Sequence, residues 1–135
     1  MAEAAPTLRG RPLSPHLQVW RWHVTLAASI LHRLTGMALY GGALILAGWA
    51  VALASGPGPY GGYMRILGSA PGKIALFALT VALLFHMANG VRHLVWDSGK
   101  GFELKTADAT AVIALIFGVA GAMVVWLIAA AAGAL

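Results

Sequence analysis

Three long apolar runs, separated by short polar stretches, dominate the distribution of hydrophobic residues along the chain. They span about residues 26–53, 72–96 and 108–132, and each is long enough to cross the hydrocarbon core of a bilayer as a helix. The third run is rich in Ala and Gly, small residues that let helices pack closely. The pattern therefore predicts an all-α integral membrane protein, in which residues 1–135 form one transmembrane domain of three helices.

The first 24 residues depart from this pattern and predict a tail followed by a short interfacial segment. Ser14 and Pro15 have the residue types of an N-cap and a first helical position. Trp20 and Trp22 follow, and indole rings prefer the boundary between membrane and water. The alternative is a disordered leader that carries two surface tryptophans. We expect no cleavable signal peptide, because no apolar run precedes Ser14.

The two connections between the runs differ in character. Residues 55–72 are rich in Gly and Pro and predict a turn-forming loop, with two tyrosines as anchors at the membrane interface. Ser69 and Pro71, near its end, are typical of the start of the next helix. Residues 98–107 are charged and predict a second, shorter loop. Successive helices are therefore expected to run antiparallel.

The composition supports a membrane protein. Hydrophobic residues make up 60% of the chain and charged residues only 10%, with a mean hydropathy of +0.82. A soluble domain carries about a quarter charged residues. Three spans leave no room for a soluble catalytic domain within these residues. The chain has no cysteine, which excludes disulfides, cysteine-ligated iron–sulfur clusters and covalently attached c-type haem.

The formal net charge of +5 arises mostly at the ends of the apolar runs. That placement indicates membrane topology and anionic head groups rather than a nucleic-acid partner. The positive-inside rule places the N-terminus and the loop of residues 98–107 in the cytoplasm and the C-terminus outside. We expect the inner (cytoplasmic) membrane of a bacterium. The charges that favour this orientation are Arg9, Arg11, Arg21, Arg92, Lys100 and Lys105.

Ionisable residues are concentrated in one stretch, His86–Asp97, at the end of the second run. Such groups are rare at membrane depth and usually face a bundle interior, a cavity or a cofactor. His86 and His93 are seven residues apart and lie about two turns apart on one helical face. Gly90 lies between them and leaves a notch where a flat ligand can approach the backbone. We interpret this face as the wall of a haem pocket.

A second polar group, Ser29, His32 and Arg33, stands near the start of the first span. One explanation is that His32 and Arg33 extend to the lipid head groups. Alternatively, Ser29 and Arg33, at positions i and i+4, form a polar pocket that hydrogen-bonds a carbonyl oxygen or a carboxylate. An antiparallel hairpin brings this group to the depth of the His86–Asp97 stretch. We therefore expect it to meet Arg92 and the other polar residues there in one composite site.

His86 is the deepest histidine, and neutral imidazole is a common haem ligand. His86 and His93 cannot both ligate one iron, because they share a face and are separated by about 10 Å of helical rise. The third span offers no second axial ligand. We expect that ligand from a partner subunit, so that this chain forms part of a larger helical bundle. A hydrogen-bonded bundle histidine and a proton relay are the alternatives.

Two motifs carry a resemblance to a known family. Ser29–Gly36 reads SILHRLTG, and His86–Asp97 reads HMANGVRHLVWD. With the lead-in RPLSPHL at residues 11–17 and the three-span plan, they resemble the cytochrome b membrane-anchor subunit of succinate dehydrogenase, respiratory complex II. Trp20 is a departure, because a tyrosine is expected there in this family.

The resemblance implies roles by position. His86 would be the axial ligand of the iron of haem b, shared with a second small anchor subunit. His32, Arg33 and His93 would surround the haem, and Ser29 and Arg33 would line the ubiquinone site. A flavoprotein subunit and an iron–sulfur subunit would be the other partners. They would oxidise succinate and pass electrons to ubiquinone, so this chain would not itself oxidise succinate.

Two other functions stay open from the sequence. One is a b-type anchor of fumarate reductase, which has a related architecture. The other is a small transporter or assembly subunit without a redox cofactor, whose polar residues form a proton path. The resemblance places Arg92, His93 and Asp97 at the cytoplasmic rim and assigns no individual role to them.

Overall fold

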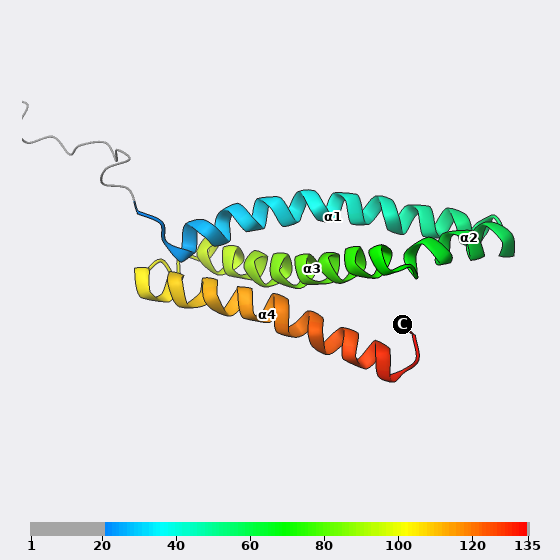
Figure 1. Ribbon diagram of the computed structural model, residues 1–135. Coiled ribbons are helices and arrows are strands. Elements are labelled where there is room, and N and C mark those ends of the chain that lie inside the picture. Colours follow the sequence, from blue (N-terminus) through cyan, green and yellow to red (C-terminus); the bar gives the residue numbers. More distant parts are fainter. Residues whose placement is uncertain (1–20, 135) are drawn as a thin grey trace, which may run out of the picture.

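The computed structural model describes residues 21–134, and these form four α-helices. They are α1 (Val24–Ala54), α2 (Pro57–Leu67), α3 (Ala70–Asp97) and α4 (Leu104–Ala131) (Figure 1). Three of them, α1, α3 and α4, are long and apolar enough to cross a membrane. The predicted all-α class with three long apolar helices is therefore confirmed. Most of the predicted interfacial segment, including Ser14 and Pro15, lies outside the described residues.

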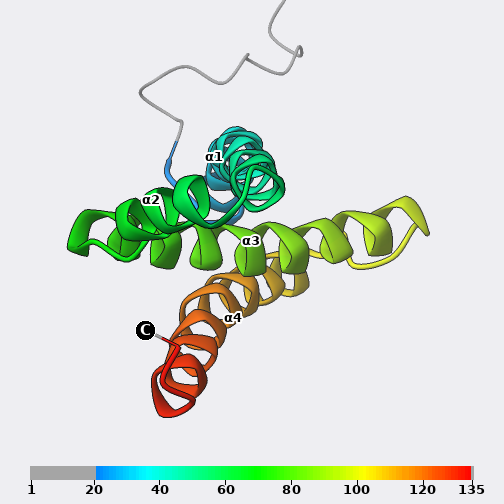
Figure 2. The ribbon, with the colours of Figure 1, turned by 90° about the vertical axis from the view of Figure 1, so that its right-hand side faces the viewer.

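The three long helices lie side by side, with α3 between α1 and α4 (Figures 1 and 2). Consecutive long helices run antiparallel, so the start of α1, the end of α3 and the start of α4 lie at the same end of the molecule. Thr25 of α1 donates a hydrogen bond of 2.6 Å to the carboxylate of Asp108 of α4 and ties two of these segments together. Toward its C-terminus α4 diverges from α3 (Figure 1).

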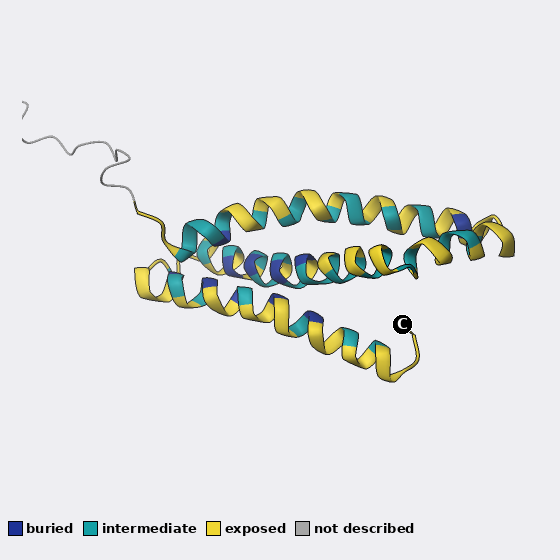
Figure 3. Cartoon of the chain, in the orientation of Figure 1, coloured by how far each residue is buried: buried dark blue, intermediate teal, exposed yellow. Residues whose placement is uncertain are grey.

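Small residues form the contact between α3 and α4. Phe85 of α3 is 3% exposed and packs against Ala111 and Ala114 of α4 and Ala28 of α1. Gly118 lets the helices approach closely, because a Cβ there would lie 2.7 Å from the Cβ of Phe85. Buried positions concentrate on these facing surfaces, whereas the outer faces are mostly exposed (Figure 3).

The outer surface of the long helices is apolar. Leu46 of α1, Ile74 of α3 and Leu127 of α4 are each more than 60% exposed in the isolated chain. An apolar surface of this extent is unfavourable in water and is suited to lipid or to partner helices.

The connection between the first two spans is not the loop that the Gly and Pro content predicted. Residues 57–67 form the helix α2, and this prediction was wrong. Proline is compatible with a first helical turn, and Pro57 occupies that position, preceded by Gly56 at a φ of 101°. Tyr63 of α2 donates to the backbone oxygen of Ile45 at 2.7 Å, which fastens α2 against α1.

The helix starts follow local capping. The Ser69 side chain accepts from the N–H of Gly72, with Pro71 in the first turn, so the predicted start of the second span is confirmed. At α1 the His23 ring nitrogen Nδ1 accepts from the N–H of Leu26. α4 begins at Leu104 rather than near 108, so the helix extends about one turn beyond the apolar run.

Candidate functional site

Three histidines gather where α1 meets the second half of α3. The rings of His32 and His86 are stacked, with centroids 3.9 Å apart and planes 9° from parallel. The ring of His93 lies 5.1 Å from that of His32 and packs edge-on against Trp96 at 5.0 Å. The structure thus brings His32 of the first span to the two histidines of the second at one depth.

Hydrogen bonds fix which nitrogen of His86 carries its proton. Its Nδ1 lies 3.1 Å from the backbone oxygen of His32 and 3.1 Å from the hydroxyl oxygen of Thr35. A carbonyl oxygen has no hydrogen to give, so Nδ1 must be the donor to His32. The Thr35 hydroxyl directs its own hydrogen to a backbone oxygen, at 2.8 Å from Leu31 or 3.0 Å from His32. In the neutral ring the lone pair therefore lies on Nε2, free for a metal ion.

Glycines leave space beside the His86 ring. A Cβ on Gly36 would lie 3.1 Å from Cε1 of His86, which is closer than side chains normally approach. A Cβ on Gly90, one turn along α3 from His86, would meet no atom within 4 Å among the described residues. Gly36 thus lets the His86 ring lie close to α1, and the open space at Gly90 fits the expectation that a flat group approaches α3 there.

Ser29 and Arg33 lie one turn apart on α1, as their spacing predicted. Ser29 is half-buried and Arg33 is exposed. Within residues 21–134 neither side chain has a hydrogen-bond or ion-pair partner. Both groups are therefore available to a ligand or to another chain.

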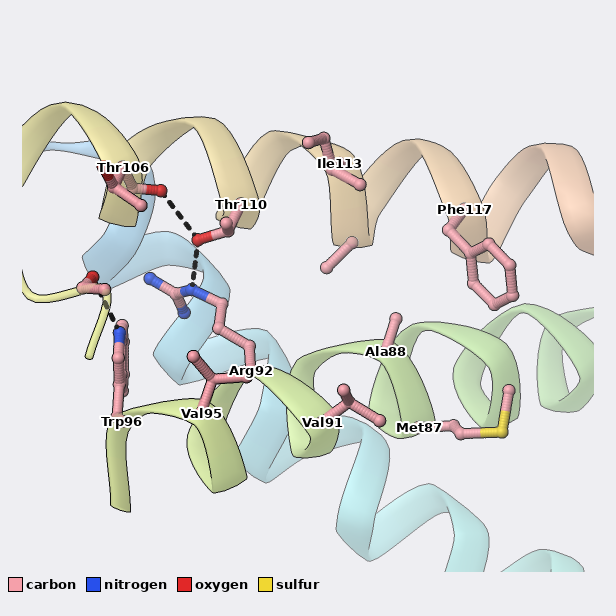
Figure 4. Close-up of a pocket in the computed structure, with 12 residues that line it drawn as sticks. Met87, Ala88, Val91, Arg92, Val95, Trp96, Thr106, Thr110, Ile113 and Phe117 are labelled. Atoms are coloured by element: carbon pink, nitrogen blue, oxygen red, sulfur yellow. Dashed lines mark hydrogen bonds between the residues drawn. The ribbon is translucent and has the colours of Figure 1, made fainter. Parts of the chain in front are cut away.

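Arg92 does not join the composite site that the sequence predicted. It is 6% exposed and turns toward α4, where Nε donates to the Thr110 hydroxyl at 3.0 Å (Figure 4). A terminal nitrogen donates to the backbone oxygen of Ala107 at 3.0 Å. Its guanidinium also lies 4.0 Å from the centre of the Trp96 ring. The expectation failed because a buried guanidinium needs several acceptors, and α4 supplies them.

Arg92 also lines a cavity of 430 Å³ between α3 and α4 (Figure 4). The other walls are almost entirely apolar and include Val91, Ile113 and Phe117. The cavity is a separate feature from the histidine cluster, because none of the three histidines lines it.

Asn89 is a residue of the site that the sequence analysis missed. It is fully buried, its Oδ1 accepts from Arg92 at 3.1 Å, and its amide nitrogen donates to Nε2 of His93 at 3.3 Å. The chain of bonds connects α4 to the histidine cluster. An amide in an apolar helix, four residues before His93, is the signal that could have identified it.

His32 has a buried Nδ1 with no hydrogen-bond partner among the described residues, although leaving such an atom unpaired costs about 1–3 kcal/mol. Residues 21–134 also contain no group of three or more His, Cys, Asp or Glu side chains arranged to hold a metal ion. A metal that used His86 would need ligands from elsewhere.

Asp97, which was expected at the same composite site, lies at the end of α3 and is exposed.

Comparison with known proteins identifies the family. Residues 7–133 match the family described as succinate dehydrogenase/fumarate reductase transmembrane subunit. The chain is 34% identical over 116 residues to the succinate dehydrogenase cytochrome b556 subunit of Rickettsia felis, covering 86% of this chain and 90% of the relative. It is 38% identical over 118 residues to the mitochondrial succinate dehydrogenase cytochrome b560 subunit of Homo sapiens, covering 84% of this chain and 68% of the relative. The chain therefore belongs to the succinate dehydrogenase/fumarate reductase transmembrane subunit family, as a multi-pass cytochrome b anchor subunit of succinate dehydrogenase.

Proposed function

We propose that His86 gives this subunit's axial ligand to a haem b, through Nε2, and that a second small anchor subunit gives the other. The observation that carries the proposal is the pair of contacts that hold the Nδ1–H of His86 and leave Nε2 free. The relatives are named as cytochrome b subunits, which supports the same cofactor. When bound, the haem supplies a one-electron redox centre.

His32, Arg33 and His93 are proposed to surround that haem. Within the part of the chain that the structure describes, the buried Nδ1 of His32 and the guanidinium of Arg33 have no partner, which supports this role because haem propionates are anions that accept hydrogen bonds. His93 is held by Asn89 and by Trp96, which fixes its ring beside that of His32. The charge of Arg33 would offset the charge of a carboxylate in a medium of low dielectric constant.

Ser29 and Arg33 are further proposed to bind ubiquinone. The Ser29 hydroxyl donates to a quinone carbonyl oxygen, and the guanidinium of Arg33 stabilises negative charge that develops on a quinone oxygen. Reduction of the quinone takes two electrons and two protons. Ser29 or His32 would relay a proton to the quinone, since both side chains carry groups that donate and accept hydrogen bonds. The availability of both Ser29 and Arg33 supports this assignment.

The partners proposed are a flavoprotein subunit, an iron–sulfur subunit and the second anchor subunit. The flavoprotein oxidises succinate, and the iron–sulfur subunit passes the electrons to the quinone. The proposed location is a bacterial inner membrane, with the N-terminus and the loop between α3 and α4 in the cytoplasm. The distribution of Lys and Arg along the chain supports this orientation. The polar end of the bundle would then face the succinate-oxidising subunits.

The test is a reduced-minus-oxidised absorbance spectrum of the purified complex carrying His86→Ala. We expect the haem bands to disappear or to change in position. His23→Ala is the matched control, because His23 caps α1 and lies outside the cluster. An unchanged spectrum in His86→Ala would contradict the ligand assignment. A wild-type complex without haem absorbance would instead favour an anchor that uses no haem.

A further inference from the structure

The hydroxyl of Thr35 makes three polar contacts at the histidine cluster. It lies 2.8 Å from the backbone oxygen of Leu31, 3.0 Å from that of His32 and 3.1 Å from Nδ1 of His86. We propose that Thr35 and Gly36 are positioning residues for His86, with the Thr35 oxygen as an acceptor that tunes the iron ligand and Gly36 as the space into which its ring fits. The proposal rests on the proposed role of His86 and adds which residues set the orientation and the basicity of its ring.

The roles of donor and acceptor follow from the count of hydrogens. Thr35 has one hydroxyl hydrogen, and the two backbone oxygens near it accept only. Since Nδ1 of His86 donates to the His32 oxygen, it also offers its hydrogen to the lone pairs of Thr35. The Nδ1–H is thus shared between two acceptors on α1. Such partners fix the orientation of a metal-binding imidazole and raise its basicity.

The backbone of α1 holds Thr35 in this role. Its bonds to Leu31 and His32 lie within one helical turn, so the hydroxyl is anchored to its own helix. His86 approaches from α3 and docks against this fixed oxygen. The relative position of the two helices therefore decides the orientation of the ring.

Gly36 leaves the space on α1 that the His86 ring occupies. A Cβ there would lie 3.1 Å from Cε1 of His86 and 3.8 Å from its Nδ1. Cε1 lies between Nδ1 and Nε2 in the ring. A steric clash at Cε1 would therefore tilt the ring and change the direction of the Nε2 lone pair. The small residue after Thr35 lets the ring sit close enough to α1 to make both hydrogen bonds.

Thr35→Val tests the hydroxyl in the intact complex. Removal of one acceptor makes the imidazole a weaker donor to iron, so we expect the midpoint potential of the haem to rise and haem affinity to fall about tenfold. Thr35→Ser keeps the hydroxyl and should restore both values. Thr80→Val is the matched control, because Thr80 is a second threonine within a long helix, and it bonds Trp126 and Leu76 rather than a histidine. If Thr35→Val fails to assemble, Thr35→Ala removes the same oxygen without a new methyl group.

Gly36→Ala tests the space. We expect a shift of the haem bands and a faster loss of haem than in the wild-type complex. Gly41→Ala is the control, because Gly41 lies about 140° around the same helix and a Cβ there meets no described atom within 4 Å.

Two results separate this inference from the proposed function. If His86→Ala leaves the haem spectrum unchanged, the proposed function fails and the positioning role falls with it. If His86→Ala removes the haem but Thr35→Val matches the wild type in potential and affinity, only the positioning role is overturned. Equal changes in Thr35→Val and Thr80→Val would also overturn it, since that pattern indicates general loss of packing.

Discussion

The rings of His32 and His86 lie parallel with centroids 3.9 Å apart, although 54 residues separate them in the chain. The backbone oxygen of His32 also accepts from the ring of His86 at 3.1 Å. One residue of α1 therefore touches both the face of the neighbouring imidazole and its Nδ1–H. This contact joins the polar group of the first span to that of the second, and the proposed haem and quinone sites share it.

Arg33→Ala is predicted to lower quinone reductase activity about 100-fold, because it removes a positive charge at the point where a quinone oxygen gains negative charge. Succinate oxidation with an artificial acceptor should be unchanged, since that reaction does not use the quinone site. The measurement compares the two activities of one purified complex. Arg65→Ala, in α2, is the control. Equal loss of both activities in Arg33→Ala would count against a role in the quinone site.

Ser29→Ala is predicted to raise the KM for ubiquinone up to about tenfold, because one neutral hydrogen bond contributes about 1 kcal/mol. The haem spectrum should stay as in the wild type, since the hydrogen bonds of His86 go to Thr35 and His32 and not to Ser29. Ser55→Ala is the control, because Ser55 bonds the backbone of Val51 at the other end of α1. A KM that does not change would remove Ser29 from the quinone site.

Arg92→Leu is predicted to destabilise the complex by about 1–3 kcal/mol, because it removes three hydrogen bonds and leaves the buried Oδ1 of Asn89 without the donor it has in the structure. Arg92→Lys should be nearly as harmful, since one ammonium cannot reach three acceptors in the geometry of a guanidinium. Thermal inactivation of the detergent-solubilised complex gives the comparison. Wild-type stability in both variants would show that the buried network is dispensable.

Gly118→Ala is predicted to destabilise the packing of α3 on α4 by about 1–3 kcal/mol. The added Cβ would lie 2.7 Å from the Cβ of Phe85 and 3.2 Å from its backbone nitrogen, and backbone cannot move aside as a side chain can. Gly61→Ala in α2 should be neutral, because a Cβ there meets no described atom within 4 Å. The same thermal measurement applies, and equal stability of the two variants would contradict the close helix contact.

Much of the fold could be predicted from residue patterns because membranes restrict the choices. A lipid environment requires every backbone polar group to be paired within its own segment, so long apolar runs become helices. The three spans and the start of α3 after its N-cap Ser69 followed from that rule and from local capping. The helix α2 did not, since Gly and Pro content indicates a break in structure and cannot show that Pro57 begins a new helix.

The candidate site was also predictable only in part. Its residue types and their depth came from the sequence, because ionisable groups in apolar helices stand out and an antiparallel hairpin sets their level. The partners of Arg92 could not be predicted from the sequence. Whether the guanidinium turns to α1 or to α4 depends on which helix presents free acceptors near it. Asn89 and Thr35 were missed for the same reason, since a single polar side chain acquires a role only through what packs against it.

The sequence by itself determined that three helices cross a membrane and that His32, Arg33 and His86 lie at matching depths, because hydropathy and helical spacing act along the chain. Only the tertiary structure decided which nitrogen of His86 is free, because that depends on the oxygens of His32 and Thr35 on another helix. Hydrogen-bond direction is a property of neighbours in space, and no periodicity along a single helix records it.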